Sequence, residues 1–270
     1  MTDPPKYNWL RKSILAFGII APIWTIIYVQ FDWVMALVPL LISHLLILYP
    51  TLVPHSQWWG PVLRSFKTSG KEVWITIDDG PTPEHTEKIL DLLDRYHAQA
   101  TFFVIGMRAK KYPQLIEKIL ERGHQISNHT LTHPSRSFWC ALESKVFAEI
   151  DGCADVIGSA QFTSRAYFRA PAGLKNFFVH RVLQRRTMHL IGWTARGFDT
   201  GKRDPDQVTV RILKRVKPGA IVLLHEGHQL ADDPEYNPTC VEQTLRGLAE
   251  AGYSFVIPRA KQLQRCAAGK

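Results

Sequence analysis

Two adjacent carboxylates at the end of a hydrophobic run indicate metal-assisted hydrolysis. Asp78 and Asp79 follow Val-Trp-Ile-Thr-Ile at 73–77 and precede Gly80 and Pro81. Neighbouring carboxylates repel one another unless a positive group relieves the repulsion. A divalent metal does so if one carboxylate binds it, which leaves the other free as a general base. Taken alone, Asp-Asp-Gly-Pro is more often a surface turn.

A pair of histidines offers the remaining ligands for such a metal. His129 and His133 are four residues apart, which places both imidazoles on one face of a helical turn, as in H-x-x-x-H zinc sites. Two imidazoles and one carboxylate leave open positions for water, which is typical of catalytic sites. A histidine pair at this spacing is more often without a metal, but the two patterns together favour one.

The elements that must position these groups alternate between strand and helix. Helical patterns follow Thr82, which we expect as an N-cap before Pro83, and recur near 115–120 and from 143, 175, 204 and 241. This alternation predicts a parallel α/β sheet, either open or closed into a barrel. Strands are expected at 73–77, 100–105, 125–127, 166–168, 188–193, 220–224 and 253–257.

Polar side chains follow the expected strands at their carboxyl ends. Asp78 follows the first run, His129 the third and Arg169 the fourth. Asp199 lies past the fifth run, and His225 ends the sixth. In parallel α/β folds these ends share one face of the domain. Groups that converge from several strands fit the mouth of a barrel better than the single crevice of an open sheet.

The first 65 residues are a separate hydrophobic region. Two uncharged runs, 13–29 and 33–49, lie back to back, and each would form a helix of roughly 25 Å, slightly short of a bilayer core of about 30 Å. No small-residue cleavage site follows the first run, so a cleaved signal peptide fits poorly. A buried soluble hairpin is the alternative. Pro22 and Pro39 also permit a kinked hairpin that enters one leaflet only.

The charges around this hairpin predict its orientation. Basic residues precede the first run and follow the second. The short connection between the two runs contains one charged residue, Asp32. By the positive-inside rule both ends lie in the cytoplasm, which puts the following domain on the cytoplasmic face of a bacterial inner membrane. If only the first run spans the membrane, the topology inverts.

Composition and cysteines exclude several classes of protein. The chain has 270 residues, 46% of them hydrophobic, which is enough for a core of one domain and argues against disorder. Four cysteines without C-x-x-C spacing argue against a disulfide framework. The net charge of +9 suits nucleic acid, an anionic membrane or a phosphorylated substrate, but no nucleic-acid module is recognisable, so we expect no nucleic-acid partner.

Five segments together resemble the motifs of a known family. They are 76–81, 129–133, 169–173, 193–199 and 223–225. In order and approximate spacing they resemble the polysaccharide deacetylase family, also called the NodB-homology or carbohydrate esterase 4 family. The resemblance implies a distorted (β/α) barrel of about seven parallel strands, here preceded by the N-terminal hydrophobic helical hairpin. The expected division is a membrane hairpin at 1–52, a linker at 53–71, a catalytic domain at 72–260 and a tail at 261–270.

The resemblance also implies a metal site and a base. Asp79, His129 and His133 would bind a divalent metal, commonly zinc in this family. Asp78 would deprotonate the attacking water, and Arg169 would hold its orientation and lower its pKa.

An acid and a set of substrate contacts follow from the same resemblance. His225, tuned by Asp199, would protonate the departing amine. The backbone N–H of Ala172 would help to bind the oxyanion. Further substrate contacts are expected from Pro171, Trp193 and Leu223.

The chain departs from the family pattern around the groove. Ile77 replaces a usual Phe, Ala172 a usual aromatic residue, and Thr200 a usual Trp. These changes weaken the aromatic lining that stacks on sugar rings. The sequence therefore supports the type of reaction more strongly than it supports a long polysaccharide as the substrate. The segment 227–239 is expected at the mouth. No ligand pattern includes the remaining histidines, for which we expect surface or structural positions: His85, His97, His124, His180, His189 and His228.

Three functions compete at this point. The first is a metal-dependent hydrolase that removes an N-acyl group, most simply N-acetyl, from an amino sugar in a membrane-bound, polyprenyl-phosphate-linked glycan precursor. The second is the same chemistry in the periplasm or at the cell surface, with only one spanning segment, on peptidoglycan or poly-N-acetylglucosamine. The third is a non-catalytic membrane binding module, against which the complete metal and acid-base set argues.

Overall fold

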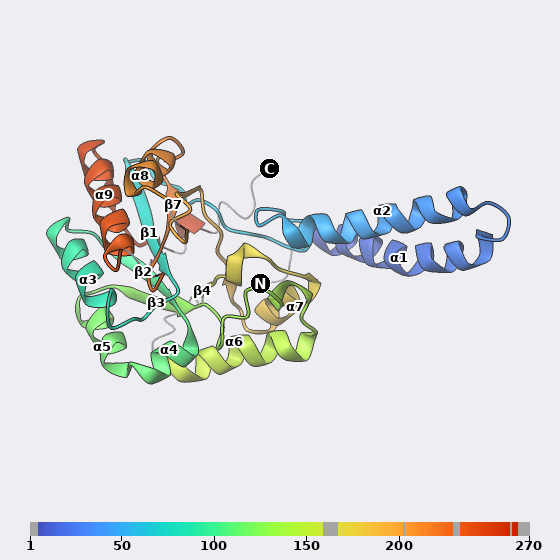
Figure 1. Cartoon of the computed structure of the whole chain (residues 1–270), viewed down its shortest axis with the longest axis horizontal. Helices are drawn as coiled ribbons and strands as arrows, with labels where there is room; N and C mark the ends of the chain where they lie inside the picture. Colours follow the sequence, from blue (N-terminus) through green and yellow to red (C-terminus); the bar gives the residue numbers. More distant parts are fainter. Residues whose placement is uncertain (1–4, 159–166, 202, 229–232, 260, 264–270) are drawn as a thin grey trace.

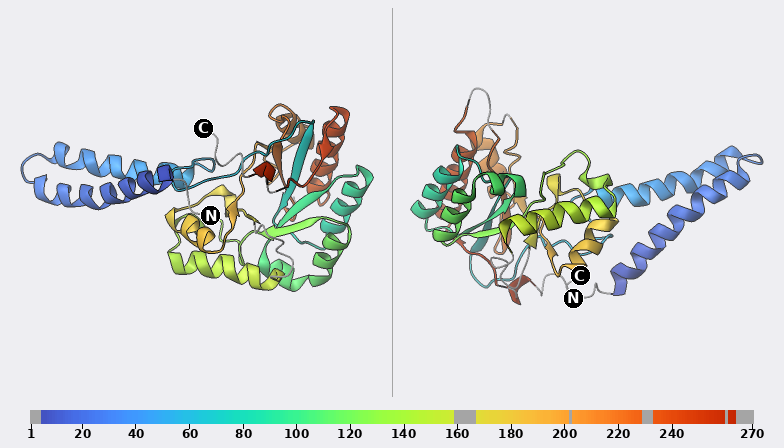
Figure 2. Two further views of the ribbon diagram at one scale, coloured as in Figure 1. Left: turned by 180° about the vertical axis from the view of Figure 1, so that it is seen from behind. Right: turned by 90° about the horizontal axis from the view of Figure 1, so that it is seen from below.

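The N-terminal segment is a hairpin of two long helices that projects from a globular α/β domain (Figures 1 and 2). The computed structural model describes residues 5–158, 167–201, 203–228, 233–259 and 261–263. Helix α1 is Pro5–Tyr28 and helix α2 is Trp33–Leu52. Asp32 begins α2, because its carboxylate accepts hydrogen bonds from the backbone N–H groups of Val34 and Met35.

The surface of the hairpin is apolar and largely exposed. Both helices are long and hydrophobic enough to cross a membrane: 20 residues in each, Trp9–Tyr28 and Trp33–Leu52, have mean hydropathies of 1.6 and 1.9. At about 1.5 Å per residue, 20 residues span about 30 Å, the thickness of a hydrocarbon core. The helices run through Pro22 and Pro39 without a break in either. Such a hairpin differs from the core hairpin of a soluble protein, whose apolar side chains are covered.

A single parallel sheet forms the centre of the domain. Its path is β5-β4-β3-β2-β1-β7-β6, and β8 pairs with the start of β1. This curled sheet confirms the predicted distorted barrel of about seven parallel strands. The strands are β1 Glu72–Asp78, β2 Ala100–Val104, β3 Gln125–Asn128, β4 Tyr167–Phe168, β5 His189–Leu190, β6 Ala195–Arg196, β7 Ala220–His225 and β8 Ser254–Phe255.

Most strands coincide with sequence expectations, but the run 188–193 was expected as one strand and only His189–Leu190 is β5. The chain then turns, and the separate two-residue strand β6 pairs with β7 instead. Residue 166 lies outside the described residues, as does part of the expected mouth segment 227–239.

Helices cover the outer face of the sheet (Figure 1). The first begins at Thr86 rather than near Thr82, because the Thr82 hydroxyl donates to Glu226 and the chain makes a turn before the helix starts. The last begins at Tyr236, five residues earlier than expected. The helices are α3 Thr86–Arg95, α4 Gly106–Lys111, α5 Pro113–Glu121, α6 Glu143–Ile157, α7 Phe177–Arg185, α8 Pro205–Leu213 and α9 Tyr236–Glu250, with short 3-10 turns at Phe138–Cys140 and Pro171–Gly173.

The alternation of side chains along β1 separates the core from the interior of the curled sheet. Val73, Ile75 and Ile77 pack against the covering helices in one hydrophobic cluster. Trp74 belongs to a second cluster inside the curl, and the same side of the strand carries Thr76 and Asp78. A carboxylate therefore ends the inward-facing row, where groups from other strands can reach it.

The segment after α2 joins the sheet. Leu63 bridges to Ile191 in parallel, and Ser65 bridges to Ala220 in antiparallel fashion. Leu63 N–H donates to Leu190 at 2.9 Å, and Phe66 N–H donates to Gly219 at 2.9 Å. The chain that leaves the hairpin is therefore hydrogen-bonded to β5 and to the residue just before β7.

Candidate active site

The predicted metal ligands meet at the carboxyl ends of β1 and β3. Asp79 Oδ1 lies 3.3 Å from His129 Nε2 and 3.1 Å from His133 Nε2. The three ligand atoms all lie within 4.8 Å of one another. Asp79 and His129 are buried, and His133 is partly buried.

The chemistry of these three residues fits a metal ion. Asp79 Oδ1 is buried, and within the described chain no hydrogen bond reaches it, although two imidazole nitrogens lie beside it. The other nitrogen of His129, Nδ1, lies 2.8 Å from the carbonyl oxygen of Arg169. A proton on Nδ1 leaves the Nε2 lone pair free for a metal. Burial and the nearby His129 lower the pKa of His133 to about 4, so its imidazole is neutral at pH 7, as a ligand must be.

The two histidines do not share a helical turn, contrary to the sequence expectation. The segment from His129 to His133 is irregular, and its backbone bends at Thr130, with φ 70°, and at His133, with φ 55°. Asp79 also has a positive φ of 73°. The ligands therefore converge through bends after two strands rather than through helical spacing, and the hydrogen bond from His133 N–H to the Thr130 hydroxyl stabilises one of these bends.

Asp78 lies beside the metal ligands and is held by a buried arginine. Arg169 NH1 donates to Asp78 Oδ1 at 2.6 Å and to the Thr76 hydroxyl at 2.8 Å. The same guanidinium donates to the carbonyl oxygens of Ile191 and Gly192 and lies over the Phe103 ring. The other oxygen of Asp78 lies 3.7 Å from His129 Nε2. Arg169 thus fixes one carboxylate oxygen while the second faces the ligand cluster.

A second buried pair lies at the end of β7. His225 Nδ1 lies 2.9 Å from Asp199 Oδ1, and His225 N–H donates to Asp199 Oδ2 at 2.7 Å. Burial disfavours the imidazolium, but the Asp199 carboxylate outweighs it and raises the pKa of His225 to about 9. Asn237 in turn donates to the backbone oxygen of Asp199. His225 is therefore protonated at neutral pH with its Nε2 unused by Asp199.

The four expected substrate contacts occupy two kinds of position. Pro171 and Ala172 form a 3-10 turn after β4, in which Ala172 is exposed and has a positive φ of 53°. Trp193 is only 5% exposed and Leu223 only 2%, so both are mostly part of the interior. The turn packs closely against Trp193, because a Cβ atom on Gly173 would lie 2.5 Å from the Trp193 ring.

Comparison with known proteins gives the family. The sequence model of the family described as polysaccharide deacetylase matches residues 66–191. The chain is 33% identical over 190 residues, 70% of its length and 84% of the relative, to a chitooligosaccharide deacetylase of Bradyrhizobium sp. (strain ANU 289). It is 32% identical over 206 residues, 73% and 91% of the two chains, to a peptidoglycan-N-acetylglucosamine deacetylase of Bacillus cereus. The chain belongs to the polysaccharide deacetylase family.

Solved structures of this family have the same fold. The Bc1960 peptidoglycan N-acetylglucosamine deacetylase, in complex with an N-oxidanyl-benzamide compound, matches with a TM-score of 0.65 at 25% identity, over 74% of this chain and 92% of that one. A mutant of the BA3943 pseudoenzyme with restored enzymatic activity matches with a TM-score of 0.61 at 25% identity, over 70% and 66%. The predicted family and its class of enzyme are confirmed. Because the family also contains a pseudoenzyme, the chemistry of this member rests on its own residues.

His228 was expected to be a surface or structural histidine, yet it reaches the metal-ligand cluster of this family member. Its Nε2 lies 2.7 Å from Asp79 Oδ2, and its ring lies 5.6 Å from that of His225. Burial raises the pKa of Asp79, but the contacts with His129 and His228 outweigh this effect and hold the pKa well below its usual range. In the sequence, only the expected position of the segment 227–239 at the mouth connected His228 to the site.

Glu226 was not singled out from the sequence, although it directly follows His225 and organises the start of α3. Its carboxylate accepts hydrogen bonds from the hydroxyls of Thr82 and Thr86, and burial raises its pKa to about 7. A Cβ atom on Gly80 would lie 1.7 Å from Glu226 Oε1. This close approach explains the glycine after the two aspartates, since any side chain would displace Glu226.

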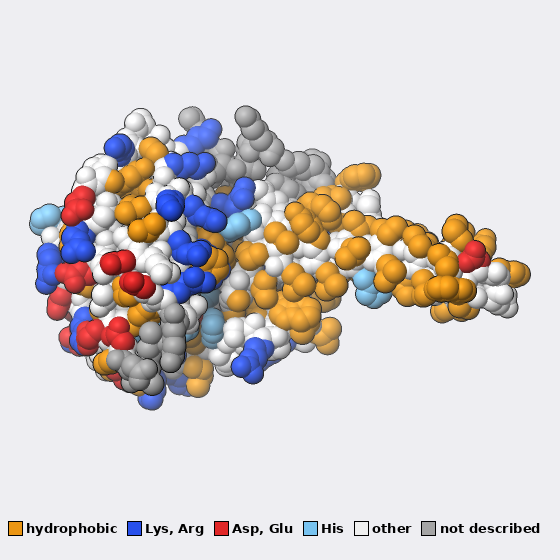
Figure 3. Space-filling view, turned by 45° about the horizontal axis from the view of Figure 1, so that its top comes forward, with side chains coloured by type: hydrophobic (Ala, Val, Ile, Leu, Met, Phe, Trp, Pro, Cys, Tyr) orange, Lys and Arg blue, Asp and Glu red, His pale blue; other side chains and the backbone are white. Residues whose placement is uncertain are grey.

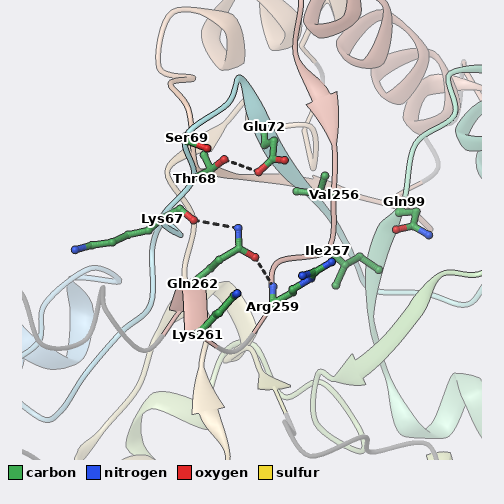
Figure 4. A pocket seen from close by; sticks show the side chains of 10 residues that line it. All are labelled: Lys67, Thr68, Ser69, Glu72, Gln99, Val256, Ile257, Arg259, Lys261 and Gln262. Carbon is green, nitrogen blue, oxygen red and sulfur yellow. Dashed lines mark hydrogen bonds between the residues drawn. The ribbon is translucent and has the colours of Figure 1, made fainter.

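A cavity of about 560 Å³ lies at the other end of the sheet and belongs to a different part of the domain (Figure 4). It includes Glu72 at the start of β1 and Gln99 just before β2. Gln262 crosses it and donates to the Lys67 carbonyl oxygen at 3.0 Å. Because these residues lie at the amino ends of the strands, the cavity has no part in the site at their carboxyl ends.

Proposed function

We propose that the protein is a metal-dependent deacetylase that removes the N-acetyl group from an amino sugar at a membrane. The proposal rests on one observation, which is that three groups of side chains lie together at one end of the sheet. They are the Asp79, His129 and His133 cluster, the Asp78–Arg169 pair and the His225–Asp199 pair. Amide hydrolysis needs a base for water and an acid for a poor leaving group. The Asp78–Arg169 pair would supply the base, and the His225–Asp199 pair would supply the acid.

Asp79, His129 and His133 would hold the metal, for which two imidazoles and one carboxylate favour zinc. Such an ion, when bound, supplies Lewis acidity that polarises the acetamide carbonyl. Asp78 takes the proton from the attacking water, and Arg169 keeps its second oxygen directed toward the cluster. His225 then donates a proton to the departing amine, while Asp199 stabilises its charged form.

The substrate-side residues serve binding rather than proton transfer. Ala172 lies on an exposed turn, where its backbone N–H would bind the developing oxyanion. Its methyl group leaves room for a sugar where an aromatic side chain is usual in the family. The Trp193 ring packs against this turn at Gly173, Pro171 begins the turn, and Leu223 lies in the interior on β7. A binding-only role for the domain is disfavoured, because it needs none of the acid-base groups.

The membrane hairpin favours a substrate that is itself lipid-linked. The chain that leaves α2 is hydrogen-bonded to the sheet, and Lys175 donates to the carbonyl oxygens of Val53 and Pro54, so the domain is attached directly to the end of the hairpin. An enzyme and a substrate confined to one surface meet at a raised effective concentration. The relatives named as chitooligosaccharide and peptidoglycan deacetylases favour the second candidate, a polymer of N-acetylglucosamine outside the inner membrane.

Release of acetate, measured by mass spectrometry, separates these substrates. We expect the full-length protein to release acetate from polyprenyl-phosphate N-acetylamino sugars, and a chelator to stop the release until zinc is restored. Release from soluble N-acetylglucosamine oligomers alone would favour the polymer. No release from either would contradict the proposed reaction.

We infer a cytoplasmic position for the catalytic domain, at a bacterial inner membrane, from the basic residues that flank the hairpin and the positive-inside rule. Reporter fusions after residue 70 and at the C-terminus test this topology. We expect activity from a reporter that functions only in the cytoplasm at both positions. Activity of a periplasm-only reporter at either position would instead place the domain outside.

A further inference from the structure

A basic cavity of about 490 Å³ lies beside the proposed acid and takes no part in the mechanism above. Four cationic side chains line it, and Asp206 is the one carboxylate in the lining. Arg196 comes from β6, and the other three cations come from α8 and the residues directly after it: Arg211, Lys214 and Arg215. Within the described chain none of the four forms an ion pair with a carboxylate, so the cavity has an uncompensated positive charge.

An aromatic ring in the lining of this cavity lies close to several of the cations. Phe198 is 37% exposed, and the guanidinium of Arg196 lies 4.1 Å from its ring centroid. The guanidiniums of Arg203 and Arg211 lie 5.4 and 5.9 Å from the same centroid. Arg196 Nε is buried and, among the residues that the structure describes, has no hydrogen-bond partner. A buried donor of this kind is costly unless a ligand satisfies it.

Two residues that line the cavity lie close to the proposed acid. Phe198 directly precedes Asp199, and Arg196 pairs in register with Leu223, two residues before His225. Burial lowers the pKa of Arg196, while Asp199 and Asp78 raise it. Arg196 and Phe198 therefore connect the lining of the cavity to the strand and the carboxylate that position His225.

On its other side the cavity approaches the base of the hairpin. Arg196 lies 5.2 Å from the Trp193 ring centroid, and that ring lies 5.0 Å from the ring of His55, three residues after α2. Burial and then four cations, Arg215 among them, lower the pKa of His55 to about 4. Figure 3 shows Lys and Arg side chains gathered where the globular domain meets the apolar hairpin.

We propose that the cavity around Phe198 binds a phosphate or diphosphate group carried by the sugar substrate. A planar guanidinium can donate two parallel hydrogen bonds to the oxygens of one phosphate. The negative charge of a phosphate ester would also neutralise the cations that line the cavity. The position between His225 and the hairpin suits a phosphate that joins the sugar to a lipid. This assignment rests on the proposed deacetylation of an amino sugar at the membrane.

A pair of substrates that differ only in the phosphate tests the assignment. The full-length, zinc-loaded protein in phosphatidylcholine vesicles is given N-acetylglucosamine 1-(decyl phosphate) or decyl N-acetylglucosaminide. We expect a higher kcat/KM for the phosphate, and the ratio between the two to fall about tenfold in the double variant Arg211→Gln/Arg215→Gln. The matched control is Lys110→Gln/Arg246→Gln, which removes two exposed positive charges elsewhere and keeps the ratio.

Binding separates failure of this assignment from failure of the reaction. Equilibrium dialysis with Asp78→Asn gives the same preference for phosphate without turnover. A preference in binding that the double variant loses supports the cavity even if no acetate is released. Hydrolysis of both substrates with equal kcat/KM would overturn it. So would a preference that disappears when phosphatidylglycerol is added to the vesicles, since the cavity would then take a lipid headgroup.

Discussion

Asp78→Asn is expected to lower kcat at least about 10³-fold while the protein still binds zinc, because the amide cannot accept the proton of water. The fold should survive, since an amide oxygen can still accept from Arg169, which also donates to Thr76 and to two backbone carbonyl oxygens. Asp79→Ala is expected to lose both zinc and turnover. It removes the buried oxygen that lies 3.3 and 3.1 Å from the two imidazoles.

Acetate release and zinc content after dialysis, measured on the same samples, distinguish the two aspartates. Asp155→Asn is a matched control, since it removes an exposed carboxylate on α6. A thermal unfolding curve for each variant checks that the domain is folded. If Asp78→Asn turns over at the rate of the wild type, Asp78 is not the base. If Asp79→Ala retains stoichiometric zinc, the proposed ligand set is wrong.

Much of this site could be predicted because strand alternation determines it. The row Trp74, Thr76 and Asp78 follows from a period of two along one strand, and a parallel sheet places Asp78 and His225 at the same end. The register of β1 and β7 pairs these two residues directly. The pairing of Arg169 with Asp78, by contrast, came from the family resemblance, because no local pattern indicates contact between residues so far apart in sequence.

The parts that were missed depend on bends and on long-range contacts. His129 and His133 have helical spacing, but positive φ angles at Thr130 and His133 bring them together without a helix. Residues 195 and 196 form a strand only because β7 provides a partner, so no periodicity could reveal them. His228 lies in the segment 227–239, which sequence alone marked only as a mouth loop, and Glu226 directly precedes that segment. Their contacts with Thr86 and Asp79 cross about 140 residues or more.

The pH dependence of turnover tests the proposed acid. His225 has a pKa of about 9 against an ordinary 6.5, so it is protonated throughout the neutral range and loses its proton as the pH rises through 9. If His225 donates the proton to the leaving amine, kcat falls above about pH 9. Because the pKa of His225 is higher in the folded state, this group also stabilises the fold. The contribution is fully present below about pH 6.5 and is lost as the pH rises through about 9, the pKa in the folded state.

Asp199→Asn is expected to move this alkaline limb down by about one pH unit or more and to lower kcat by about 10²- to 10⁴-fold. The Asp199 carboxylate lies 2.9 Å from His225 Nδ1 and stabilises the imidazolium. When it is replaced, the more distant Asp78 and Asp79 remain to counter the effect of burial, which lowers the pKa of His225. Asparagine preserves the size of the side chain and an oxygen for the His225 N–H. Initial rates from pH 6 to 10 measure the shift, with Asp155→Asn as the variant that keeps the wild-type profile. An alkaline limb that stays in place in Asp199→Asn would assign the titration to another group, because only a group coupled to Asp199 must move with it.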